Sequence, residues 1–74
     1  MRKSFRKRVK PVRVGETYNV SVTEVSKRGD GVARIKGFVI FIPGARVGDQ
    51  VKILITTVRD RFAVAKLLEV SGES

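Results

Sequence analysis

Cationic and aromatic side chains are the residues of this chain whose types and spacing suggest chemistry. Cations replace the counterions of nucleic-acid phosphates, and planar rings offer surfaces on which unpaired bases stack. The sequence therefore predicts a binding surface for an unpaired nucleic-acid strand. Its candidate residues are Lys27, Arg28, Arg34, Lys36, Phe38, Arg46, Arg59, Arg61 and Phe62.

The centre of this predicted surface is a basic pair spaced by two residues, Arg34 and Lys36. If Ala33 and Ile35 face a core, the alternation of a strand turns the basic pair outward. The next strand can then present Phe38 beside the two cations. A core position is the open alternative for Phe38, because the apolar run around it has no polar residue to mark its solvent face.

The other rings have structural interpretations. Phe41 shares a strand face with Val39, and we predict that it belongs to the core. Tyr18 continues an apolar alternation, which predicts a half-buried core position, with base stacking as the alternative. Phe62 has the alternative role of closing one end of the fold.

The beginning of the chain is a run of positive charge. The formal net charge of the protein is +9 and its pI is about 11.0, which favours a polyanionic partner. We predict a flexible arm over residues 1–13 that binds nucleic acid. The alternative, a helix lying on a membrane surface, would have only Phe5 and Val9 as apolar anchors. The seven cations of the arm are Arg2, Lys3, Arg6, Lys7, Arg8, Lys10 and Arg13.

Catalytic chemistry is not supported by the residue inventory. The chain has no His and no Cys, so the common bases, nucleophiles and zinc ligands are missing. Asp30, Asp49 and Asp60 fall in predicted turns, where Asp commonly shapes the backbone, and no phosphate-binding loop is present. We predict no enzymatic activity, no metal, no cofactor and no small-molecule substrate. Without a signal peptide or a membrane-length apolar run, we expect a cytoplasmic protein with no membrane partner.

The elements that would position these residues are short strands separated by Gly, Pro and Asp. We predict strands over residues 17–26, 32–36, 38–42, 51–56 and 62–70, and no helix. These strands indicate an all-β fold, a small five-stranded antiparallel barrel of the oligonucleotide-binding type over residues 14–70. Residues 71–74 form a polar end.

Four segments, in this order and spacing, resemble the TRAM domain. They are Gly31-Val32-Ala33-Arg34, Gly37 to Ala45, Val47 to Val51, and Phe62-Ala63-Val64-Ala65. The resemblance spans residues 14–70, with Val47 departing from the Pro that the family often has. It implies a small barrel that holds RNA, as in the RNA methyltransferases and methylthiotransferases that carry such domains. With nothing attached, the chain looks like the small TRAM proteins of archaea.

That resemblance implies cold-shock-like RNA binding and RNA chaperone activity without ATP. We expect a monomer that binds tRNA, rRNA or mRNA with low sequence specificity. The preference for RNA over single-stranded DNA comes from the resemblance alone. The alternative function is a ribosomal protein, or an accessory subunit of an RNA-modifying enzyme, that holds tRNA or rRNA.

Overall fold

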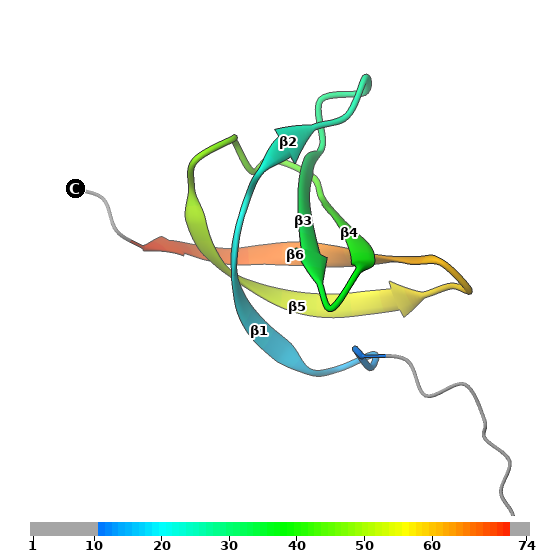
Figure 1. Cartoon of the computed structure of the whole chain (residues 1–74). Helices are drawn as coiled ribbons and strands as arrows, with labels where there is room; N and C mark the ends of the chain where they lie inside the picture. The colour runs from blue at the N-terminus through cyan, green and yellow to red at the C-terminus, as the bar shows by residue number, and fades with distance from the viewer. Residues whose placement is uncertain (1–10, 72–74) are drawn as a thin grey trace, which may run out of the picture.

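Six strands form one sheet in the structure, a computed structural model that describes residues 11–71. Their order across the sheet is β1-β5-β6-β4-β3-β2 (Figure 1). No helix occurs within the described residues, which confirms the all-β prediction. The strands are β1 (Thr17–Ser21), β2 (Glu24–Val25), β3 (Gly31–Ile35), β4 (Phe38–Ile42), β5 (Gln50–Val58) and β6 (Phe62–Ser71).

The predicted strand over residues 17–26 is divided into β1 and β2, so the prediction of five strands is wrong. The division falls at two residues that turn toward different neighbours. The backbone N–H of Val22 donates to the carbonyl of Asp49, next to β5, at 2.9 Å. The N–H of Thr23 donates to the carbonyl of Val32 in β3, also at 2.9 Å. Because β1 and β2 are the two outer strands of the order, this junction curls the sheet strongly upon itself.

One strand pair also differs from the predicted antiparallel arrangement. Strands β4 and β6 run parallel, with Val39 opposite Phe62 and Phe41 opposite Val64. All other pairs are antiparallel. Parallel pairing is possible here because β5 provides the return connection between the two strands. It brings the start of β6 beside β4, which matters for the candidate site.

The β3–β4 hairpin has a two-residue turn, formed by Lys36 and Gly37. Their φ angles are 50° and 85°, and positive φ at both central residues is typical of a type I′ turn. Such a turn makes Ile35 and Phe38 the last facing pair of the hairpin. Both side chains therefore lie on the same face of the sheet.

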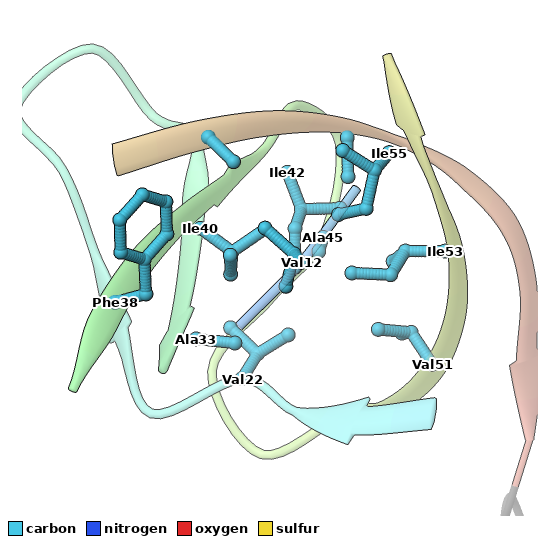
Figure 2. Packing of buried hydrophobic residues seen from close by; sticks show 12 residues of the cluster. Val12, Val22, Ala33, Phe38, Ile40, Ile42, Ala45, Val51, Ile53 and Ile55 are labelled. Atoms are coloured by element: carbon cyan, nitrogen blue, oxygen red, sulfur yellow. The ribbon is translucent and has the colours of Figure 1, made fainter. Parts of the chain in front are cut away.

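The concave side of the curled sheet is filled by aliphatic side chains (Figure 2). From β4, Ile40 and Ile42 point into this core, and from β5, Ile53 and Ile55 do so; all four are fully buried. The prediction that Tyr18 is half-buried against the core is confirmed.

The core also extends further toward the N-terminus than the sequence predicted. Val12 is only 2% exposed, although it lies within the range predicted as an arm. The backbone N–H of Gly15 donates to the carbonyl of Ile55 at 2.8 Å and ties this segment to β5. Residues 11–13 thus belong to the folded part, because a buried Val stabilises it.

Candidate nucleic-acid interface

The face of β4 that points away from the core carries Val39 and Phe41. Phe38 is 9% exposed and packs in the core, so the predicted exposed ring at this position is wrong (Figure 2). The prediction that Phe41 is a core residue is wrong for the same reason: it lies half-buried on the outer face. The two-residue turn explains both results, because it places Phe38 on the side of Ile35 and hence Phe41 on the opposite side.

An aromatic pair occupies this outer face. The ring centroids of Phe41 and Phe62 are 5.5 Å apart, and the ring planes are inclined at 75°, an edge-to-face arrangement. Such pairs contribute about 0.5–1.5 kcal/mol beyond the burial of their surface. Phe62 remains 36% exposed. The parallel register of β4 and β6 is what brings the two rings together.

A groove of about 410 Å³ lies beside the pair. One wall is aromatic and apolar, and the other comes from the loop between β2 and β3. Arg28 places a positive charge at this groove, and Asp30 places a carboxyl group there. The lining residues are Ser26, Arg28, Asp30, Phe41, Pro43, Phe62 and Val64.

The loop wall of the groove is held by a dense set of hydrogen bonds. The Ser26 hydroxyl oxygen accepts from the backbone N–H of Arg28 at 3.3 Å and from that of Asp30 at 3.2 Å. The N–H of Ser26 donates to the carbonyl of Asp30 at 2.8 Å. Gly29 supplies the positive φ of 92° that this tight turn needs. These hydrogen bonds therefore hold the backbone at Asp30 in place.

The β5–β6 hairpin tip adds a second hollow next to the first, with Phe62 shared between them. Arg59 and Arg61 both line it. The N–H of Arg59 donates to the carbonyl of Phe62 at 2.7 Å and closes the tip. Two cations thus stand beside the exposed ring.

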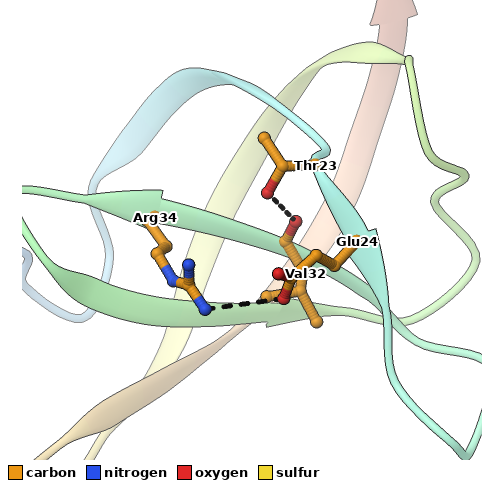
Figure 3. Close-up of polar contacts among 4 residues, drawn as sticks. All are labelled: Thr23, Glu24, Val32 and Arg34. Atoms are coloured by element: carbon orange, nitrogen blue, oxygen red, sulfur yellow. Dashed lines mark hydrogen bonds and ion pairs between the residues drawn. The ribbon is translucent and has the colours of Figure 1, made fainter.

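Arg34 lies on the same outer face. It is opposite Val39, which in turn is opposite Phe62, so the three residues form one row across β3, β4 and β6. Its guanidinium is 3.5 Å from the Glu24 carboxylate (Figure 3). Both side chains are largely solvent-exposed, so this ion pair is weak and leaves the guanidinium available to other anions.

The remaining predicted residues are dispersed. Lys27 is exposed in the β2–β3 loop beside Arg28. Lys36 lies in the β3–β4 turn and Arg46 in the β4–β5 loop, and neither lines the two hollows. The structure thus groups Arg28, Arg34, Arg59, Arg61 and Phe62 around one face.

Of the seven cations of the predicted arm, only Arg13 falls within the described residues, and it is exposed. The other six cations lie outside residues 11–71: Arg2, Lys3, Arg6, Lys7, Arg8 and Lys10.

Among the titratable side chains, Tyr18 has a shifted pKa. The Tyr18 hydroxyl donates to the Glu16 carboxylate at 2.5 Å, and this bond raises the pKa of the tyrosine above 10.0. Within residues 11–71 there is no cluster of acids, His or Cys suited to a metal ion. The same residues contain no helix that could cross a membrane.

Sequence reasoning missed Phe41, Ser26 and Asp30 as lining residues. For Phe41 a signal was present in the sequence. Lys36-Gly37 is a pair that allows a tight reversal, and a two-residue turn puts Phe38 on the same face as Ile35. For Ser26 and Asp30 no local pattern gave a signal, because the strand that faces their loop is distant in sequence.

Comparison with known sequences places the chain in a protein family. Residues 11–68 match the TRAM domain, and the chain belongs to the TRAM domain family. Since a TRAM domain is an RNA-binding domain, membership implies that the chain binds RNA.

Three relatives show the kinds of protein that contain a segment similar to this sequence. An uncharacterised protein of Methanocaldococcus jannaschii is 45% identical over 76% of this chain and 73% of its own length. The ribosomal RNA large subunit methyltransferase E of Methanothrix thermoacetophila is 46% identical over 80% of this chain. The translation initiation factor 2 subunit beta of Thermoplasma acidophilum is 39% identical over the same share. The chain spans 23% of the methyltransferase and 28% of the factor subunit.

A solved structure supports the fold independently. The solution structure of a conserved protein of Methanococcus maripaludis superimposes with a TM-score of 0.78 at 40% sequence identity. The superposition covers 81% of this chain and 86% of the other. The curled sheet is thus an experimentally observed arrangement for a close sequence relative.

Proposed function

We propose that this protein binds unpaired RNA, without catalysis, on the outer face of β3, β4 and β6. The observation that carries the proposal is the Phe41–Phe62 pair on the outer sheet face, where Phe41 is half-buried and Phe62 is 36% exposed. Arginines line the two hollows beside Phe62, and Arg34 lies in the same row across the sheet. Each ring stacks with a nucleobase, and the surrounding guanidinium groups contact phosphates. The arginines in question are Arg28, Arg34, Arg59 and Arg61.

The energies of base stacking and of base-pair opening fit a protein that binds RNA with modest affinity. Stacking one base on an aromatic ring is worth about 1–3 kcal/mol. Opening one DNA base-pair step costs about 1.4 kcal/mol, and RNA is comparable. Binding to strands that open transiently therefore shifts the equilibrium toward the unpaired state. The protein acts in this way as an RNA chaperone in the cytoplasm, as a monomer and without ATP.

Two measurements test this function. Fluorescence anisotropy with a short unstructured RNA should give saturable binding, and a hairpin labelled with a fluorophore and a quencher should open as protein is added. Phe41→Ala and Phe62→Ala should each weaken binding by roughly fivefold or more, the loss expected for one stacked base. Leu68→Ala is the matched control, since Leu68 is exposed on β6 but lines neither hollow.

Absence of any complex at low salt would overturn the RNA-binding proposal. Binding without hairpin opening would remove the chaperone activity only.

A second candidate function is an accessory role in which the domain holds tRNA or rRNA for a larger assembly. It is favoured by the relatives named ribosomal RNA methyltransferase and translation initiation factor subunit, in which the matching segment is about a quarter of the chain. Crosslinking to total cellular RNA separates the two functions. Many bound RNAs indicate a chaperone, and a single dominant site indicates an accessory role.

A further inference from the structure

We infer that the groove beside Phe41 and Phe62 selects guanine, and that the Asp30 carboxylate and the Ser26 hydroxyl read its Watson–Crick edge. This inference rests on the proposed RNA-binding function and adds a base preference to it. It begins from one feature of the groove: a stacking wall faces a wall with polar groups that still have hydrogen-bonding capacity.

The Asp30 side chain has two acceptor oxygens, and it is half-buried where it lines the groove. Within residues 11–71 no hydrogen bond or ion pair involves this carboxylate; the bonds of Asp30 come from its backbone. A carboxylate is an acceptor only, so a partner in the groove must offer donors.

Ser26 adds the complementary group. Its hydroxyl oxygen already accepts from two backbone N–H groups, those of Arg28 and Asp30. A hydroxyl has two acceptor sites and one donor, so the donor is the capacity that remains. No acceptor for it occurs within the described part of the chain. The loop wall therefore has one unused donor, on Ser26, and two unused acceptors, on Asp30.

Guanine has the matching edge among the four bases. Its Watson–Crick edge carries the O6 acceptor and then two adjacent donors, N1–H and the N2 amino group. Cytosine and adenine each offer one donor group beside an acceptor, and uracil has one donor between two acceptors. Two donors side by side suit a bidentate carboxylate, and unpaired RNA bases are commonly read on this edge.

The backbone of the loop is also closely packed against its neighbour. Gly31 follows Asp30, and a Cβ at Gly31 would lie 2.7 Å from the Cβ of Ala45. The β4–β5 loop therefore packs directly against the backbone that carries Asp30. Because the backbone at Asp30 is held in this way, the carboxylate can shift only by side-chain rotation to accommodate a poor match.

The test uses four uridine heptamers with G, A, C or U at the centre, and a fifth with inosine, which lacks the N2 amino group. By fluorescence anisotropy, the guanine heptamer should bind about tenfold more tightly than the all-uridine heptamer. Inosine should lose most of that advantage. Asp30→Asn should bring guanine and uridine to within about twofold, since an amide offers one acceptor and one donor in place of two acceptors.

Glu69→Gln is the charge control. It removes one exposed acid from β6 outside the groove, so it should retain the guanine preference while changing overall affinity as Asp30→Asn does. Far-UV circular dichroism verifies that both variants are folded.

The possible outcomes separate the inference from the function on which it rests. Equal binding of all heptamers, or a guanine preference that survives in Asp30→Asn, would overturn the inference and leave RNA binding intact. The inosine result does not depend on any variant folding. Failure of every heptamer to bind would overturn both.

Discussion

Ile35 and Phe38 face each other across the closed end of the β3–β4 hairpin, and both point toward the core. This relationship decides which ring of the apolar run meets solvent. With Phe38 inside, Phe41 is outside and meets Phe62. A one-residue change of register would exchange the two rings.

The different positions of these rings predict different consequences of truncation. Phe38→Ala should lower the free energy of unfolding by about 3–4 kcal/mol, because it leaves a cavity in the core. Phe41→Ala should cost less stability and should instead weaken RNA binding. Urea denaturation of both variants, with anisotropy on the folded fraction, measures the two effects. The assignment of faces fails if Phe41→Ala proves the more destabilising of the two.

The β3–β4 turn predicts a stabilising substitution. Lys36 has a φ of 50°, a left-handed conformation that costs an ordinary residue roughly 1 kcal/mol and that Asn adopts more readily. Lys36→Asn creates the Asn-Gly pair favoured in type I′ turns, so stability should rise by about 0.5 kcal/mol. Thermal denaturation checks this value.

Lys36→Ala is the control for the turn, because it removes the same charge but gives no help to the left-handed conformation. A variant Lys36→Asn no more stable than Lys36→Ala would contradict the explanation.

The N-terminal segment should divide into a charged part and a structural part. Deleting residues 2–10 removes six cations, so the slope of log affinity against log salt should become shallower by up to about 4, at roughly 0.7 per phosphate contact. The thermal midpoint should change little. Val12→Ala should instead lower stability by about 2 kcal/mol, since its side chain is only 2% exposed.

These two variants are measured by a salt titration of binding and by denaturation. An unchanged salt slope after the deletion would show that these cations do not contact phosphates.

Tyr18 should titrate at higher pH than a free tyrosine. Its hydrogen bond to Glu16 stabilises the protonated phenol and raises the pKa above 10.0. Because the folded-state pKa is the higher one, the stabilising contribution is complete below pH 10 and is lost as pH rises through the folded-state pKa. Tyr18 is the single tyrosine and the chain has no Trp, so absorbance near 295 nm follows it directly.

Glu16→Gln removes the carboxylate charge and should lower the midpoint of this titration. A midpoint that does not move would mean that the raised pKa has a different cause.

The sequence by itself determined the all-β class of the fold and the sign of the charge on the binding partner. Period-two alternation and regularly spaced Gly, Pro and Asp are local properties, so the β4 strand was predicted with correct bounds and the start of β6 at Phe62 was located correctly. Charge is additive along the chain. A net charge of +9 therefore predicts a polyanionic partner even when the tertiary structure is not known.

The tertiary structure decided which side chains share a face. Phe38 to Ile42 is apolar throughout, so its alternation carries no information about the solvent side, and only pairing with β3 settles the direction of Phe41. The contact between Phe41 and Phe62 depends on a parallel pairing in which facing residues are 23 positions apart in sequence. Long-range pairing is set by the closure of the whole sheet, a property that no local segment encodes.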